Sequence, residues 1–110
     1  MPKIIRSNGA PAPIGPYSQA VLAGGALYCS GQLGIDPQTG EINGDVTAQT
    51  ERAVANIGAV LTQAGMGFEN VVKTTCFLAS IDDYAAFNAV YEKYFVSKPA
   101  RSCVAAALPR

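Results

Sequence analysis

The chain has 110 residues, which suits one domain, and its eight basic and eight acidic residues give a formal net charge of zero. The basic residues are not clustered, which argues against a general nucleic-acid binder. The sequence contains no histidine, which excludes His-based triads and most zinc sites. Any catalysis must therefore use carboxylates, tyrosines, thiols, arginines, backbone N–H groups or water.

The composition also bears on assembly and location. Hydrophobic residues make up 49% of the chain and charged residues 15%, against about 25% charged in an average soluble domain. We therefore expect other copies of the chain to cover part of the apolar surface. The N-terminus lacks the apolar core of a signal peptide, and no stretch approaches the ~20 apolar residues of a membrane span. Cys29, Cys76 and Cys103 have no CxxC spacing, so we expect reduced thiols, no metal site and a cytoplasmic protein.

The first half of the chain predicts strands and turns. Residues 3–7 form a short strand candidate, and a loop rich in Gly and Pro follows at 8–19. Two apolar runs, 18–23 and 26–32, flank Gly24-Gly25, which predicts a tight hairpin because glycine accepts a positive φ. Further turns are expected over 35–44.

From Asp45 onward the apolar spacing changes to the three- and four-residue repeat of a helix. The positions that define this face are Ala53, Val54, Ile57, Val60, Leu61 and Ala64. Asp45 or Thr47 can cap the start of the helix, and Gly65 suits a position just beyond its end. Residues 70–80 are rich in β-branched side chains and predict a strand.

A second helix and a last strand complete the chain. Residues 80–83 resemble a capping box, and behind them an aromatic stripe predicts a helix with a buried face. The stripe consists of Tyr84, Phe87, Val90, Tyr91 and Tyr94, and we expect it to be core. Lys98-Pro99 ends the helix, and residues 100–107 form the final strand.

These elements indicate one α+β domain over residues 1–110. We expect a two-layer sandwich in which both helices pack on one face of a mixed sheet of about five strands. A neighbouring subunit would cover the other face of that sheet.

Arg101 is the residue that most needs an explanation, because it lies between small residues in the last predicted strand. A guanidinium is permanently charged and is seldom placed in a sheet without a partner. It could be an edge charge that limits aggregation or makes an ordinary ion pair. It could instead be a clamp for a small carboxylate, whose two oxygens match its parallel N–H donors.

Four segments in register resemble the RidA/YjgF family of enamine/imine deaminases. They are residues 15–21 (GPYSQAV), 28–42 (YCSGQLGIDPQTGEI), 70–95 (NVVKTTCFLASIDDYAAFNAVYEKYF) and 99–104 (PARSCV). The resemblance implies a homotrimer of chorismate-mutase-like α+β subunits, with three sites in the clefts between subunits.

The resemblance also implies a set of site residues. Arg101 would grip the substrate carboxylate, and Cys103, two residues further along the same strand face, would act chiefly through its backbone. The Gly31 N–H, next to Ser30, would meet a carboxylate or carbonyl oxygen. We expect catalytic roles for Arg101, Tyr17 and Cys103, and substrate contacts from Gly31, Ser30 and Asn88 in addition.

Each of these residues also has a structural explanation. Cys103 can be a small buried hydrophobic residue, and Gly31 a bulge or strand end. Tyr17 can simply pack on the sheet, and the amide of Asn88 can cap a neighbouring loop.

The implied reaction is hydrolytic deamination of 2-aminoacrylate or 2-aminocrotonate to a 2-keto acid and ammonium. Pyridoxal-phosphate-dependent dehydratases release these enamines, and the reaction needs no cofactor or metal. The alternative is a non-catalytic trimeric binder or sensor of small keto acids or amino acids. An endoribonuclease or translation inhibitor, also ascribed to relatives, is disfavoured by the lack of histidine and of a basic patch.

Members of the family continue with one more strand, whose glutamate orients the hydrolytic water. None of the eight acidic residues falls at that position before Arg110. We therefore expect a domain without this last strand, in which carboxylate binding outlasts turnover, unless the sequence is part of a longer chain.

Overall fold

The computed structural model describes residues 2–108, and each predicted helix and strand is present. In chain order these elements are β1 (Lys3–Ile5), β2 (Ala20–Ala23), β3 (Ala26–Cys29), α1 (Val46–Gln63), β4 (Lys73–Leu78), α2 (Tyr84–Tyr94) and β5 (Ala100–Ala105). Two short 3-10 turns, Phe68–Asn70 and Ile81–Asp83, precede β4 and α2.

The strands form two ladders, whereas the sequence predicts one sheet of about five strands. β1, β2 and β3 pair in antiparallel order, and β4 pairs with β5 in parallel. No ladder joins the two groups within residues 2–108. Each ladder packs on a different part of the long helix α1. Val60 of α1 contacts the first ladder, and Val54 lies in the cluster that Cys76 of β4 packs against.

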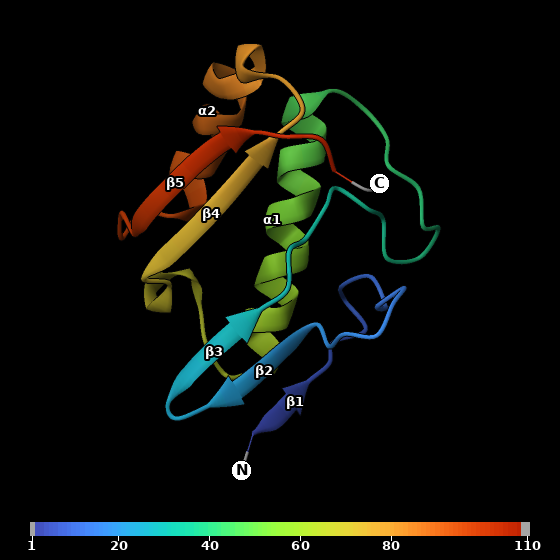
Figure 1. Cartoon of the computed structure of the whole chain (residues 1–110), viewed down its shortest axis with the longest axis vertical. Helices are drawn as coiled ribbons and strands as arrows, with labels where there is room; N and C mark the ends of the chain where they lie inside the picture. Colours follow the sequence, from blue (N-terminus) through green and yellow to red (C-terminus); the bar gives the residue numbers. More distant parts are fainter. Residues whose placement is uncertain (1, 109–110) are drawn as a thin grey trace.

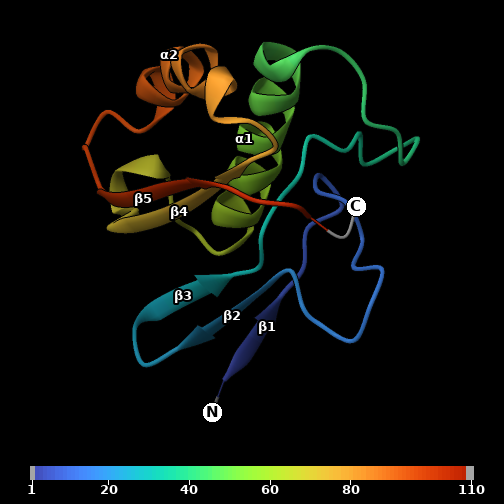
Figure 2. The ribbon, with the colours of Figure 1, turned by 45° about the horizontal axis from the view of Figure 1, so that its top comes forward.

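Both helices lie on the same side of the strands, as the sequence predicts (Figures 1 and 2). Figure 2 shows α1 and α2 above β4 and β5, with the β1–β3 ladder beside the lower end of α1. The architecture is therefore α+β, with a helical layer over one antiparallel and one parallel sheet.

The turn and cap residues up to the end of α1 act as predicted. Gly24 and Gly25 have φ values of 58° and 80°, and they close the hairpin between β2 and β3. The Asp45 carboxylate accepts a hydrogen bond from the Ala48 N–H at 2.9 Å and caps α1. Gly65, with φ of 76°, follows the end of that helix.

The cap before α2 differs from the prediction. The Ser80 hydroxyl accepts from the Asp82 N–H at 3.2 Å, but this bond caps the 3-10 turn that comes before α2. The Asp83 side chain makes no capping bond. The prediction of a capping box on α2 was therefore wrong, because one extra turn separates Ser80 from the helix.

The aromatic stripe of α2 is core only in part. Tyr91 is 8% exposed and Phe95, just after the helix, is 5% exposed, and both pack with Val54 of α1. Tyr84 is 38% exposed, which contradicts its predicted place in the core. It lies in the first turn of the helix, where its hydroxyl bonds to Arg101 of β5.

The strand faces that point away from the helices carry exposed apolar side chains. Ile4, Tyr28, Phe77 and Val104 are 67%, 66%, 51% and 44% exposed. In the parallel ladder Phe77 stands opposite Val104, and in the antiparallel ladders both Ile4 and Tyr28 pair with Val21.

Neither α1 nor α2, in the part of the chain that is described, has the length and apolarity to cross a membrane.

Candidate functional site

Arg101 lies on β5 and directs its guanidinium towards α2. Its Nη1 donates to the Asn88 side-chain oxygen at 2.7 Å, and its Nη2 donates to the Tyr84 hydroxyl at 2.6 Å. The guanidinium carbon also lies 4.7 Å from the centre of the Tyr91 ring, close enough for a cation–π contact. Three side chains of one helix therefore fix the position of this cation.

These three side chains share one face of α2 because Tyr84, Asn88 and Tyr91 are spaced by four and three residues. The Tyr91 ring is itself held, since its hydroxyl is 2.7 Å from Thr74 Oγ1 and the ring stacks on Phe95 at 4.3 Å. The sequence predicts a ligand contact or a loop cap for Asn88. In the structure its amide holds the Arg101 side chain.

The charge of Arg101 has no anionic partner in residues 2–108. The ion pairs in that range are Arg52 with Asp36 and Lys93 with Glu51. The partners of Arg101 are a neutral amide, a phenol and an aromatic ring. An ordinary ion pair, one of the two explanations offered by the sequence, is therefore not what the described chain forms.

Cys103 shares the helix-facing side of β5 with Arg101, as the spacing predicts. It is a free, half-buried thiol that lies opposite Cys76 in the parallel ladder. Burial raises the pKa of the Cys76 thiol, and the hydrogen bond with Thr74 and then the nearby Arg101 charge only partly offset this effect. Cys76 therefore stays protonated near neutral pH.

Tyr17 and Gly31 line a separate hollow of about 370 Å³, formed by the loop after β1 and the loop after β3. Pro11, Ile14, Leu33 and Ile35 supply much of its apolar wall. Tyr17 is 50% exposed. The hollow therefore combines an apolar wall with a phenol and a backbone turn.

Ser30 and Gly31 differ in whether they have a hydrogen-bond donor that could bind a ligand. The Ser30 hydroxyl donates to the Ser18 carbonyl at 2.7 Å, so its hydrogen is already used. The N–H of Gly31 has no acceptor among the described residues. A Cβ placed on Gly31 would meet no atom within 4 Å, and its φ is not in the left-handed region. The fold of this chain thus does not itself require glycine here.

One chain does not bring all the predicted site residues together. Arg101, Asn88 and Cys103 lie between β5 and α2, whereas Tyr17 and Gly31 lie at the hollow between two loops. Figure 1 shows that β5 starts on the side of the molecule away from the loop between β1 and β2. Within the described chain the predicted site is therefore split into two groups.

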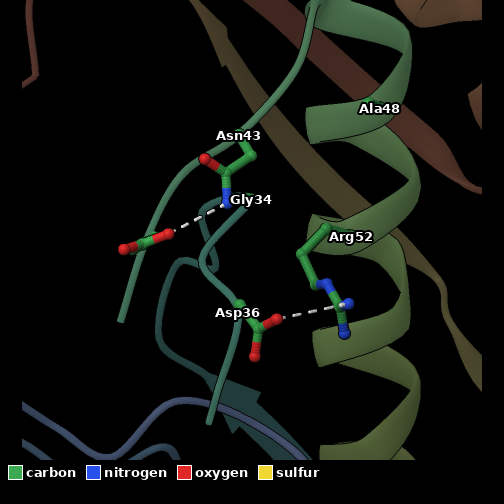
Figure 3. A pocket seen from close by; sticks show the side chains of 6 residues that line it. Gly34, Asp36, Asn43, Ala48 and Arg52 are labelled. Carbon is green, nitrogen blue, oxygen red and sulfur yellow. Dashed lines mark hydrogen bonds and ion pairs between the residues drawn. The ribbon is translucent and has the colours of Figure 1, made fainter. Parts of the chain in front are cut away.

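A smaller hollow of about 190 Å³ is lined by a second arginine, Arg52 (Figure 3). Arg52 of α1 reaches towards Asp36 at 3.9 Å, and Asn43 donates to Glu41 at 3.4 Å. Because both members of the Arg52 pair are partly exposed, the pair contributes about 0–1 kcal/mol. Arg52 therefore forms an ordinary surface ion pair, whereas Arg101 has no acidic partner among the described residues.

Residues 7–109 match the protein family described as Endoribonuclease L-PSP. The 2-iminobutanoate/2-iminopropanoate deaminase of Capra hircus is 50% identical over 111 residues, which cover 98% of this chain and 81% of the goat protein. The chain belongs to the RidA/YjgF/L-PSP family. The family resemblance of the four segments is thereby confirmed.

Solved structures of RidA/YjgF/L-PSP proteins have the same fold. The yjgF gene product of E. coli is 42% identical and superposes with a TM-score of 0.92, covering 98% of this chain and 89% of that one. E. coli TdcF, solved with bound serine, is 40% identical with a TM-score of 0.93, covering 98% and 89%.

Two buried amides support the loops of this RidA/YjgF/L-PSP chain and were missed by sequence reasoning. Gln19, 2% exposed, accepts from the Ser7 N–H at 2.6 Å and donates to the Pro11 carbonyl at 2.9 Å. Asn56 of α1, 0% exposed, donates to the carbonyls of Leu33 and Ile35 at 3.0 and 2.9 Å. Their only sequence signal is a polar residue in an apolar run.

Proposed function

We propose that this protein catalyses the hydrolytic deamination of small 2-imino acids, formed from 2-aminoacrylate and 2-aminocrotonate, to 2-keto acids and ammonium. The observation that carries the proposal is the Arg101 guanidinium, fixed in position by Asn88 and Tyr84 without a carboxylate partner. A cation prepared in this way suits a ligand anion. The goat relative, at 50% identity, is named for the same reaction class.

The carboxylate of the substrate would bind to Arg101. A guanidinium has five N–H donors, and the neutral partners on α2 engage only two of its nitrogens. The remaining donors can form charge-assisted bonds to the two carboxylate oxygens, which lysine cannot match in geometry. Binding through Arg101 would place C2 of the substrate just beyond the strand.

We propose that the rest of the site comes from a second copy of the chain. The split between the Arg101 group and the Tyr17–Gly31 group is what a site between subunits requires. The exposed apolar faces around Tyr28, Phe77 and Val104 offer a surface for the neighbouring subunits of a homotrimer. The unused Gly31 N–H would then approach a ligand held by Arg101 of the other copy.

Hydrolysis of the imine needs only modest assistance from the protein. The enamine tautomerises to an imine by moving a proton from nitrogen to carbon. Water then adds to C2, and the C–N bond of the resulting carbinolamine breaks to give the ketone and ammonia, which takes up a proton. Holding the substrate, orienting water and assisting one proton transfer, which is worth ~10²–10⁴-fold, is sufficient. Tyr17 and the backbone at Cys103 are the groups we assign to this assistance.

The test is a coupled assay in which a pyridoxal-phosphate-dependent dehydratase generates the enamine. We expect the protein to accelerate keto-acid release, and Arg101→Met to reduce kcat/KM about 100-fold or more through loss of charge-assisted bonds. Arg52→Met is the matched control, since it removes an arginine from a surface ion pair. It should retain parental activity.

Two results would contradict the proposal. One is parental activity in Arg101→Met. The other is binding of 2-oxobutanoate, seen by calorimetry, without any acceleration of keto-acid release, which would identify a binder or sensor instead of an enzyme.

A further inference from the structure

We propose that the Tyr84 hydroxyl is a second hydrogen-bond donor to the carboxylate that Arg101 binds. This inference rests on the proposed function, because it concerns the same ligand. It adds to the site a side chain that the sequence predicts to lie in the core and that is exposed in the structure.

The direction of the bond between Arg101 and Tyr84 leaves the phenolic hydrogen unused. Arginine has only donors, so at 2.6 Å the Tyr84 oxygen must be the acceptor. The hydroxyl hydrogen is then directed elsewhere, and it has no acceptor among residues 2–108. A bond accepted from a cation also polarises the O–H group and makes it a better donor.

The other two tyrosines of α2 differ in this respect. The Tyr94 hydroxyl donates to the Glu51 carboxylate at 2.6 Å, and that of Tyr91 is bonded to Thr74 at 2.7 Å. Tyr91 is 8% exposed, but Tyr84 is 38% exposed and can be reached by a small molecule. Tyr84 therefore combines access with an unused donor.

The position of this donor matches the geometry of an oxyanion. The Tyr84 oxygen lies 2.6 Å from Nη2 of Arg101, so a carboxylate that accepts from a free N–H of the guanidinium can turn its other oxygen towards the hydroxyl. Within residues 2–108 no carboxylate pairs with Arg101, so the N–H and O–H donors of the combined site face the ligand together with an uncompensated charge. It suits the carboxylate of a small 2-oxo or 2-imino acid.

The experiment compares Tyr84→Phe with Tyr94→Phe, two identical changes on one helix. With 2-oxobutanoate as the calorimetric probe, we expect Tyr84→Phe to raise Kd about tenfold, because the hydroxyl both donates to the ligand and helps to fix Arg101. Turnover should show the same rise in KM with kcat unchanged, because the bond is present in both ground and transition states. Tyr94→Phe should leave Kd and KM at parental values.

The thermal midpoint of Tyr84→Phe, measured alongside, should equal that of the parent, since the hydroxyl is at the surface. Parental Kd in Tyr84→Phe, with binding lost in Arg101→Met, would overturn the role of Tyr84 and leave the proposed function standing. A drop in kcat without a change in KM would also overturn it. Absence of both binding and turnover in the parent would overturn the proposed function and this inference together.

Discussion

At the scale of single residues, the surroundings of Arg101 decide what it can bind. Its partners on α2 are neutral, so they fix the guanidinium without cancelling its charge. Arg52 is the contrasting case, because Asp36 already accompanies it. A bound anion would meet a full positive charge at Arg101 and a partly compensated one at Arg52. Neutral neighbours, as opposed to an acidic one, are therefore what make Arg101 a candidate anion-binding residue.

Asn88→Asp tests this explanation directly. The new carboxylate would sit 2.7 Å from Arg101 Nη1 and form the ion pair that the described chain lacks. We expect calorimetry to show at least tenfold weaker binding of 2-oxobutanoate, from competition and from repulsion of the ligand charge. The thermal midpoint should be unchanged or higher.

Asn70→Asp is the matched control for this charge. Its side-chain oxygen accepts from the Gly67 N–H at 2.9 Å, which a carboxylate can also do. It should bind 2-oxobutanoate like the parent. Parental affinity in Asn88→Asp would show that the charge of Arg101 does not hold the ligand.

At the scale of elements, α1 and α2 are joined by a polar cluster at the surface. Glu51 of α1 accepts from Lys93 at 2.7 Å and from Tyr94 at 2.6 Å. These hydrogen bonds, from Lys93 first and then Tyr94, lower the pKa of the Glu51 carboxyl from its ordinary value of 4.5. The same carboxylate raises the pKa of Lys93.

The sign of the pKa shift fixes the pH at which this cluster stabilises the protein. A lowered pKa in the folded state contributes stability that is fully present above 4.5 and is lost as the pH falls through the lower folded value. We expect Glu51→Gln to lower the thermal midpoint near neutral pH, and the difference from the parent to shrink in acid. Thermal melting curves of both proteins, recorded from neutral pH to below 4.5, measure this difference.

Glu92→Gln serves as the reference, because Glu92 is an exposed acid on α2 outside this cluster. Its difference from the parent should stay small at every pH. A deficit in Glu51→Gln that grows as the pH falls would contradict the assigned role.

The contact between α1 and the loop before it depends on Asn56. Asn56→Ala would leave the carbonyls of Leu33 and Ile35 without their amide donor, in a buried position. We expect a loss of about 2–3 kcal/mol in the free energy of unfolding, measured by urea denaturation. Gln63→Ala, an exposed change on the same helix, should stay within about 0.5 kcal/mol of the parent. Equal stability of Asn56→Ala and the parent would refute the role of the amide.

At the scale of the whole molecule, the strand faces that point away from the helices expose apolar side chains. Phe77 is 51% exposed on the side away from the helices. We expect Phe77→Asp to convert an oligomer to monomers in sedimentation velocity and to abolish turnover, because each site would need two copies. Val96→Asp changes a residue that is 71% exposed in the turn after α2 and should leave the oligomer intact. An unchanged mass for Phe77→Asp would contradict an interface on this face.

The order of the elements could be predicted from the sequence because local signals fix it. Gly24-Gly25, Asp45 and Gly65 mark a turn and two helix ends by backbone chemistry alone. The split into two sheets could not be predicted, because strand pairing depends on contacts along α1 that a sequence period does not encode.

The candidate site could be predicted only in part for the same reason. Arg101 stood out as a cation in a small-residue strand, and the family resemblance supplied its expected role. The surface position of Tyr84 was missed, because an aromatic residue in register with Phe87 and Tyr91 has the spacing of a core residue. Only the contact across to β5 separates the two outcomes.

The central claim, that Arg101 holds an organic carboxylate, is tested most directly by a crystal structure of the protein with 2-oxobutanoate. We predict that the carboxylate of the ligand lies within hydrogen-bond distance of the free N–H groups of Arg101, with Asn88 and Tyr84 still in place. Ligand bound elsewhere, with the guanidinium contacting only its neutral partners, would contradict it.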